Sequence, residues 1–370
     1  MTSPAEWNSL LARAIAGEGM QSVFQPIVDL QRCRVVGYEA LTRFDLPGAP
    51  RVGPDRWFAE AERIGAGPEL DARALRIALR HRDSLPPNCF LTLNVDPLHL
   101  LEPSVRSVFA EQHDLAGIVI EMTEHRSWNW SDLEGTVDML RSSGALVAID
   151  DAGAGHSGLQ QILHMRPSIV KLDRSIIEGL DRDESKVAMV EMMGVFANRV
   201  DAWLLAEGVE TAAEARCLFD LGVPLAQGYY FARPMGPWTG VSEDARAALG
   251  GRRTAASSTE TMDRLLDQIE PLRRDEIRDH DWIASVDRWK PVIDVNERPI
   301  GVVDPEAAFD GELLATVVAN VDSTPREVAH RVATASSDPS VPVVVIDSLG
   351  KYLGIVTMRR LLRHLAGEEH

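Results

Sequence analysis

The run Leu146-Val147-Ala148-Ile149-Asp150-Asp151 is a short hydrophobic stretch that ends in two carboxylates. Three further runs also end in acids: Val119–Glu124, Ile169–Asp173 and Leu204–Glu210. Short apolar runs bounded by turn residues are typical of buried parallel strands. An acid at such a position is costly to desolvate unless another charge offsets it. Because several strands end alike, we expect the charges to meet at one rim, where divalent cations would hold them together.

The first two thirds of the chain alternate strand-like runs with amphipathic segments. The expected strands are Val23–Val28, Arg34–Leu41, Phe90–Asn94, Ile118–Glu121, Leu146–Asp150, Ile169–Leu172, Trp203–Ala206 and Leu225–Phe231. The expected helical segments are Pro54–Arg80, Trp130–Ser142, Leu159–His164, Arg182–Arg199 and Ala212–Leu221. Eight strands with helices between them predict a closed α/β barrel of the TIM-like (β/α)8 type, with functional residues at the carboxyl ends of the strands. An open doubly wound sheet is the alternative, but no glycine-rich phosphate loop follows the first strand.

The composition and pattern of the sequence change after Pro234. A small, polar and basic run, Gly250–Thr259, is typical of a flexible linker. An internal repeat follows, because Val292–Val303 is echoed by Val345–Val356 as strand, turn and strand. Helical patterns are expected at Thr324–Thr334 and Met358–Leu365. We therefore expect a barrel domain at 1–240, a linker at 241–262 and a smaller α+β domain at 263–370.

Composition excludes several classes of partner. The 370 residues carry a formal net charge of -18, which argues against nonspecific binding to nucleic acid polymers or anionic lipid. No stretch reaches the roughly 18 unbroken apolar residues of a membrane span, and no signal peptide is visible. Three widely separated cysteines and no CxxC pair fit a reduced, cytoplasmic protein. The apolar stripe from Trp7 to Ile15 has helical spacing and predicts a helix that packs on the barrel.

At this point the chain resembles the EAL-domain phosphodiesterases, which linearise the bacterial messenger cyclic di-GMP on a TIM-like barrel with two Mg²⁺ or Mn²⁺ ions. The signature is Glu39-Ala40-Leu41, preceded by Phe24-Gln25-Pro26-Ile27. Its ordered companions make the match specific: Asn94, Glu121-Met122-Thr123-Glu124, Asp150-Asp151, Lys171-Leu172-Asp173, Glu207-Gly208-Val209-Glu210 and Gln227-Gly228-Tyr229. Taken singly, such acids are ordinary helix caps or turn residues. Independent caps would not reproduce one ordered set of ligand types along eight strands.

The resemblance implies a role for each of these residues. Two adjacent metals would bring hydroxide against the phosphodiester and stabilise the charge that develops on its oxygens. The implied metal ligands are Glu39, Asn94, Glu121 and Asp150 for one ion, and Asp150, Asp151 and Glu207 for the other. The implied substrate contacts are Gln25, Arg43 and Gln227, with Arg43 clamping a phosphate. Lys171 would orient or polarise the attacking water, and Glu124 and Glu210 would support the loops. The general base stays open among Glu207, Lys171 and the attacking hydroxide itself.

One loop departs from the family pattern. The family usually has Asp-Asp-Phe-Gly-Thr-Gly, whereas this chain has Asp150-Asp151-Ala152-Gly153-Ala154-Gly155, so a ring and a hydroxyl are missing. This change favours an alternative function, a receptor that binds cyclic di-GMP or a protein partner without hydrolysis. A third alternative, another two-metal barrel hydrolase, would need a different substrate clamp. His156, at the tip of the same loop, is expected to be a surface or substrate-edge residue rather than a ligand.

The C-terminal segment resembles a pair of CBS modules, which sense adenine nucleotides or related ligands. Where that family commonly carries an acid for a ribose, this chain has Arg360 in the second copy and Ala307 in the first. A packing or dimerisation module is therefore the alternative to a nucleotide sensor. A homodimer is expected.

Overall fold

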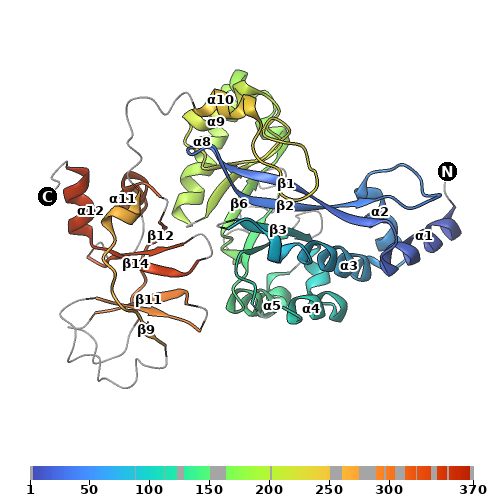
Figure 1. Cartoon of the computed structure of the whole chain (residues 1–370), viewed down its shortest axis with the longest axis horizontal. Coiled ribbons are helices and arrows are strands. Elements are labelled where there is room, and N and C mark those ends of the chain that lie inside the picture. The colour runs from blue at the N-terminus through green and yellow to red at the C-terminus, as the bar shows by residue number, and fades with distance from the viewer. Residues whose placement is uncertain are drawn as a thin grey trace. The chain divides into compact units, whose positions relative to one another are not determined.

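In the computed structural model the chain divides into two compact units, residues 1–252 and 253–370 (Figure 1). Each unit is described by itself. The described residues are 3–87, 89–112, 114–122, 129–150, 164–200, 202–250, 261–274, 289–295, 297–304, 313–321, 323–334, 340–347 and 350–366. Asp151, Glu124, His156 and the altered loop residues Ala152 and Ala154 lie outside them, as do the expected helix segment 159–163 and Ala307.

The first unit is a closed eight-stranded barrel in the order β1 to β8, as the sequence predicted. Its strands are β1 Met20–Asp29, β2 Arg34–Phe44, β3 Phe90–Val95, β4 Ile118–Met122, β5 Leu146–Ile149, β6 Ile169–Leu172, β7 Trp203–Ala206 and β8 Leu225–Ala226. β8 is shorter than expected, because the chain turns after Ala226 and Phe231 is instead anchored by a backbone hydrogen bond to the Gly228 carbonyl.

β1 runs antiparallel to both of its neighbours, whereas the other adjacent strands are parallel. The reason is the short link between β1 and β2, which contains only residues 30–33. A parallel crossover needs a dozen or more residues, so this link can only form a hairpin. The long β1–β2 hairpin is visible in blue in Figure 1.

Most of the helices lie in segments whose periodicity predicted them, whereas Pro103–Ala110, Arg174–Ile177 and Glu243–Gly250 were not predicted. The α-helices are α1 Pro4–Ala16, α2 Pro54–Arg63, α3 Gly67–Leu79, α4 Pro103–Ala110, α5 Trp130–Ser142, α7 Arg174–Ile177, α8 Glu184–Arg199, α9 Ala212–Asp220 and α10 Glu243–Gly250. Short 3₁₀ turns are η1 Arg82–Ser84, η2 Pro97–Leu101 and η3 Leu180–Arg182. The expected segment 54–80 is two helices, because the chain breaks at Ile64 and the positive-φ Gly65 before α3 begins.

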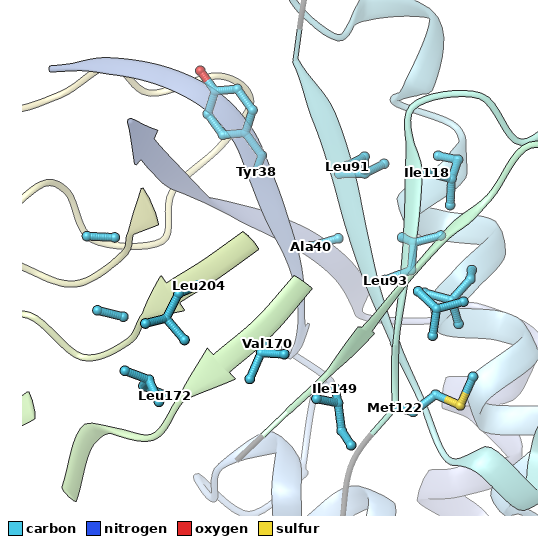
Figure 2. Close-up of a cluster of buried hydrophobic side chains, with 14 of the residues drawn as sticks. Tyr38, Ala40, Leu91, Leu93, Ile118, Met122, Ile149, Val170, Leu172 and Leu204 are labelled. Carbon is cyan, nitrogen blue, oxygen red and sulfur yellow. The ribbon is translucent and has the colours of Figure 1, made fainter. Parts of the chain in front are cut away.

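Side chains alternate between the two faces of each barrel strand, which separates two cores. The outward-facing residues pack under the helices in one large cluster, which includes Leu91, Leu93, Ile118, Met122 and Val170 (Figure 2). The inward-facing residues form an apolar floor inside the barrel: Ile27, Val119, Ala148, Ile169, Leu205 and Leu225. Two residues further along the strands, towards their carboxyl ends, the inward-facing side chains are polar.

α1 packs on the barrel domain through a separate apolar cluster, as its stripe predicted. Trp7, Leu10, Leu11 and Ala14 are buried, and the Trp7 ring meets Trp57 of α2 edge to face with centroids 5.1 Å apart. A capping box at Ser3 starts the helix, and Gly17 in the left-handed conformation ends it.

The second unit contains two copies of one motif. The first is β9 Leu272–Arg273, β10 Lys290–Ile293 and β11 Pro299–Val303, and the second is β12 Val318–Asn320, β13 Val343–Ile346 and β14 Tyr352–Val356. In both copies the middle strand is parallel to the first and antiparallel to the third. The helical elements are η4 Met262–Leu265, α11 Pro325–Thr334 and α12 Met358–Leu365. The sequence repeat is therefore also a structural repeat.

Glycines at equivalent positions allow the backbones of the two copies to approach closely. Gly301 and Gly354 occupy equivalent positions in the third strands, opposite Val292 and Val345. A Cβ on Gly354 would lie 2.9 Å from the Asp267 carbonyl oxygen, and one on Gly301 would lie 3.0 Å from the Leu314 carbonyl oxygen. The bare backbone thus lets the segment before one copy pair with the hairpin of the other, as the Asp267–Ile355 and Val302–Leu314 bridges do. No helix among the described residues is long and apolar enough to cross a membrane.

Candidate active site

Acidic and amide side chains meet inside the barrel, at the carboxyl ends of its strands. Glu121 on β4 and Lys171 on β6 point inward because they lie two residues beyond the floor residues Val119 and Ile169. Asp150 and Glu207 follow directly after β5 and β7 in the same alternation. The sequence prediction that the strand-end acids converge is therefore confirmed for these residues.

The Lys171 ammonium lies at the centre of the cluster. Its Nζ is 2.6 Å from Glu207 Oε1, 2.9 Å from Glu121 Oε2, 3.2 Å from Asp150 Oδ1 and 3.8 Å from Glu39 Oε1. Lys171 is 1% exposed. A buried ammonium of this kind is tolerable only because carboxylates surround it.

Glu39 is held by two amides. Asn94 Nδ2 donates to Glu39 Oε1 at 2.8 Å, and Gln227 Nε2 donates to Glu39 Oε2. Gln227 also lies 3.2 Å from Gln25 Oε1, and Gln25 in turn donates to the Ala232 carbonyl. The four residues thus form one hydrogen-bonded chain in the order Asn94, Glu39, Gln227 and Gln25, which connects β3, β2, the residue after β8 and β1.

The electrostatics of the cluster favour an added cation. Four carboxylates face one ammonium, which leaves three negative charges uncompensated if all are ionised. Burial, with the neighbouring charges of Asp150 and Glu39, raises the pKa of Glu207 to about 8 against the opposing effect of Lys171. Burial also raises the pKa of Glu121 well above its usual value. Glu121 and Glu207 therefore retain their protons more readily than free carboxyl groups do, and a divalent cation would displace those protons.

Glu39 and Lys171 remain charged in the same surroundings. Burial opposes the charge of Glu39, but the Lys171 charge and the hydrogen bonds from Asn94 and Gln227 outweigh it and lower the pKa of Glu39. Burial also opposes the charge of Lys171, but the surrounding carboxylates, Glu121 and Glu207 foremost, raise its pKa well above the usual value. Lys171 is therefore a cation at neutral pH rather than a free base.

The loop after β7 is held from outside the cluster. Arg174 Nη1 is 2.8 Å from Glu210 Oε1, and the Glu214 carboxylate accepts the backbone N–H groups of Gly179, Glu210 and Thr211. These contacts fix the segment that carries Glu207. The expected supporting role of Glu210 stays a prediction.

Arg43 does not join the cluster. It lies near the end of β2, and its guanidinium donates to the Thr42 carbonyl at 2.9 Å. Within the described residues it makes no hydrogen bond or ion pair with the carboxylates. Its expected role as a phosphate clamp therefore depends on a substrate that reaches it.

The oxygen atoms present fit a divalent ion. Glu121 Oε1 is buried and accepts no hydrogen bond from the described residues. Carboxylate and amide oxygens are the ligands that Mg²⁺ and Mn²⁺ prefer. Among the described residues, no three acidic, His or Cys side chains already converge as a metal-binding group, since the Lys171 ammonium stands between them. An ion would take over part of the charge that Lys171 now offsets.

The sequence analysis did not identify two buried ionisable residues near the site. Asp71 on α3 and His99 on η2 contact each other at 2.7 Å, and both are 7% exposed. The available signal was an acid between apolar residues in the helix sequence Leu70-Asp71-Ala72. An acid on a buried helix face normally has a partner.

Fold and site together define an α/β barrel protein with an acidic centre at the carboxyl ends of its strands. The EAL domain model matches residues 9–234, so the chain belongs to the EAL-domain family. The CBS domain model matches residues 315–367, and the C-terminal unit thus contains a CBS domain.

Similar proteins and solved structures match the barrel portion of the chain. The chain is 31% identical over 232 residues to the probable cyclic di-GMP phosphodiesterase PdeN of Escherichia coli K12. The matched region covers 60% of this chain and 45% of PdeN. The chain thus spans less than half of the length of this relative. Among solved structures, the PaMucR phosphodiesterase in complex with c-di-GMP is 25% identical, with a TM-score of 0.57 over 63% of this chain and 98% of that one. A manganese and cyclic di-GMP complex of Klebsiella pneumoniae BlrP1 is 28% identical, with a TM-score of 0.52 over 61% of this chain and 58% of that one.

Proposed function

We propose that this protein hydrolyses cyclic di-GMP to linear pGpG with two bound Mg²⁺ or Mn²⁺ ions. The observation that carries the proposal is the buried cluster of Glu39, Glu121, Asp150 and Glu207 around Lys171. Four carboxylates, of which Glu39 and Glu121 are buried and Asp150 and Glu207 partly exposed, exceed what one ammonium can neutralise, and a structural core has no need of such an excess. Relatives named as cyclic di-GMP phosphodiesterases support the substrate.

Each residue of the site has a separate role in the proposed reaction. Glu39, Asn94, Glu121, Asp150, Asp151 and Glu207 would hold the ions. When bound, the ions would lower the pKa of water and stabilise negative charge on the phosphoryl oxygens. Lys171, kept cationic by its neighbours, orients the attacking water and offsets charge that develops nearby. Arg43 would clamp a substrate phosphate. Gln227, which donates to Glu39, and Gln25, which accepts from Gln227, would contact the substrate.

A second function has one observation in its favour. Ala152 and Ala154 replace the ring and hydroxyl that the family pattern carries after the paired acids. A site that keeps its ligands but places the second ion poorly would bind cyclic di-GMP without hydrolysing it. The protein would then be a receptor.

An assay on the purified protein distinguishes the hydrolase from the receptor. The protein is mixed with cyclic di-GMP and Mn²⁺ or Mg²⁺, and the products are resolved by chromatography. Formation of pGpG that stops with EDTA supports the hydrolase. Binding measured by calorimetry without product supports the receptor. Glu121→Gln should abolish turnover, whereas Glu111→Gln, which alters an exposed ion pair with Arg76, should leave it unchanged.

The C-terminal unit is proposed to regulate or dimerise the barrel rather than to bind an adenine nucleotide. Arg360, which stands where the CBS pattern commonly has the ribose-binding acid, forms an ion pair with Asp267. A ribose would have to displace this pair without gaining the usual carboxylate acceptor. A cytoplasmic location and a homodimer remain part of the proposal.

A further inference from the structure

A histidine lies between two carboxylates beside the barrel. His99 Nδ1 is 2.7 Å from Asp71 Oδ2, and His99 Nε2 is 2.7 Å from Glu62 Oε1. Burial opposes a charge on His99, but the hydrogen bond and charge of Asp71, together with Asp96 and Glu62, raise the pKa of its imidazole. The His99–Asp71 contact is a short buried hydrogen bond rather than a surface ion pair, because both residues are 7% exposed.

The backbone makes room for this arrangement. A Cβ on Gly67, at the start of α3, would lie 1.7 Å from Glu62 Oε1 and 2.8 Å from His99 Cε1. With glycine there, the imidazole and the glutamate approach the helix directly. The contact thus rests on three separate segments: the end of α2, the start of α3 and η2.

Asp71 also holds the chain that leaves β3. Its Oδ2 accepts the backbone N–H of Asp96 at 3.3 Å, in addition to the His99 contact. His99 N donates to the Asp96 carbonyl at 2.9 Å, and the Asp96 side chain caps η2 through Leu98 N. One carboxylate oxygen of α3 therefore fixes both ends of the turn that follows β3.

Asn94 stands two residues before this turn. Its Nδ2 donates to Glu39 Oε1, which leaves the amide oxygen Oδ1 as the atom that can bind a cation. The direction of the amide depends on where the strand ends, because β3 pairs with β4 only as far as Val95. Beyond Val95, the Asp96 N–H donates to Asp71 Oδ2, and this bond ties the strand end to α3.

We propose that Asp71 and His99 are positioning residues that hold the end of β3, so that the Asn94 amide faces both Glu39 and a bound cation. This inference rests on the proposed metal centre. His99 fixes the Asp71 carboxylate, Asp71 fixes the Asp96 peptide, and that peptide fixes Asn94. Neither residue touches the substrate or the ions.

Matched substitutions separate this role from general stability. His99→Asn places an amide donor near the Nδ1 position and keeps the Asp71 contact, whereas His99→Gln keeps only the Glu62 contact. Asp71→Asn keeps an acceptor oxygen for the Asp96 N–H and His99, whereas Asp71→Leu removes it. Arg82→Ala serves as the control, because Arg82 bonds Asp114 and Ala116 at the opposite, amino-terminal end of β4.

The measurement is Mn²⁺ affinity by calorimetry on the full-length protein without substrate, with thermal unfolding recorded alongside. His99→Gln and Asp71→Leu should bind Mn²⁺ about 10–100-fold more weakly than the parent, as loss of ligand support does elsewhere. His99→Asn, Asp71→Asn and Arg82→Ala should stay within about threefold of the parent. Should His99→Gln not fold, the Asp71 pair carries the same comparison.

Two results would overturn the inference, and they are distinguishable. Parental Mn²⁺ affinity in folded His99→Gln or Asp71→Leu would refute the positioning role and leave the metal centre intact. If the parent protein itself binds no Mn²⁺, the proposed metal centre fails, and the positioning role fails with it. A purely structural role would lower the unfolding temperature of the variants without this change in affinity.

Discussion

Replacing Lys171 with methionine tests the charge balance of the cluster most directly. Methionine has a similar length and no charge, so the substitution removes the ammonium while filling most of its volume. At an effective dielectric of about 20, each contact between 2.6 and 3.8 Å is worth about 4–6 kcal/mol. Four such contacts would exceed the whole stability of a typical domain, about 5–15 kcal/mol.

The net loss must be smaller, because the carboxylates can take up protons instead. Burial has already raised the pKa values of Glu121 and Glu207, and both would remain neutral more readily without Lys171. The expected loss is then that of a broken buried ion pair, about 3–5 kcal/mol. A saturating divalent cation should restore part of it, about 2.7 kcal/mol at a hundredfold excess over its Kd.

Chemical unfolding in EDTA, followed by tryptophan fluorescence, measures this loss. Six of the eight tryptophans lie in residues 1–252, so the signal reports mainly on the barrel. The experiment is repeated with Mn²⁺, which should stabilise Lys171→Met more than it stabilises the parent. Lys186→Met is the control, since Lys186 is hydrogen-bonded to two backbone carbonyls outside the cluster. A loss of less than about 1 kcal/mol in EDTA would refute the charge argument.

Three further predictions follow from the same contacts. Glu39→Ala should lower turnover more than about a hundredfold with the far-ultraviolet circular dichroism unchanged, because several kcal/mol of metal-assisted stabilisation depend on it; turnover near the parental rate would contradict its ligand role. The parental advantage in unfolding free energy over His99→Gln should shrink as pH rises above 6.5, by at most about 1.4 kcal/mol per pH unit. The sign follows because Asp71, Asp96 and Glu62 raise the pKa of His99, and a raised pKa stabilises the folded state only while the imidazole is protonated. If the difference in unfolding free energy between parent and variant stayed constant across that pH range, a charged His99 would be excluded. Gly228→Ala should destabilise the barrel by about 1–3 kcal/mol in thermal unfolding, since its Cβ would lie 2.1 Å from a backbone oxygen that cannot move aside, and parental stability would show that the loop yields.

Much of the barrel follows from alternation along the strands. In β4, Ile118, Ile120 and Met122 are outward and apolar, while Val119 and Glu121 are inward, and the change from apolar to acidic marks the carboxyl end. The same alternation in β6 predicts that Lys171 points inward. The direction of β1 was not predicted, although the short link at residues 30–33 contains the information.

The ligand types of the site were predictable, but its internal order was not. Sequence runs place an acid or an amide at each strand end, yet they do not say which atoms touch. Lys171 could equally have been a surface lysine at a strand end. Only packing shows that it lies among four carboxylates, and that Gln227 and Asn94 share the two oxygens of Glu39.

The Asp71–His99 contact shows why the remainder was missed. The two residues are 28 positions apart and belong to a helix and a 3₁₀ turn, so no periodicity connects them. What the sequence does contain is a conflict: an acid on the apolar face of α3, at a position where desolvation is costly. A local rule broken without an evident local gain indicates a distant partner or a functional need. Here the partner is the turn after Asn94, and the conflict in α3 is resolved at the edge of the proposed metal centre.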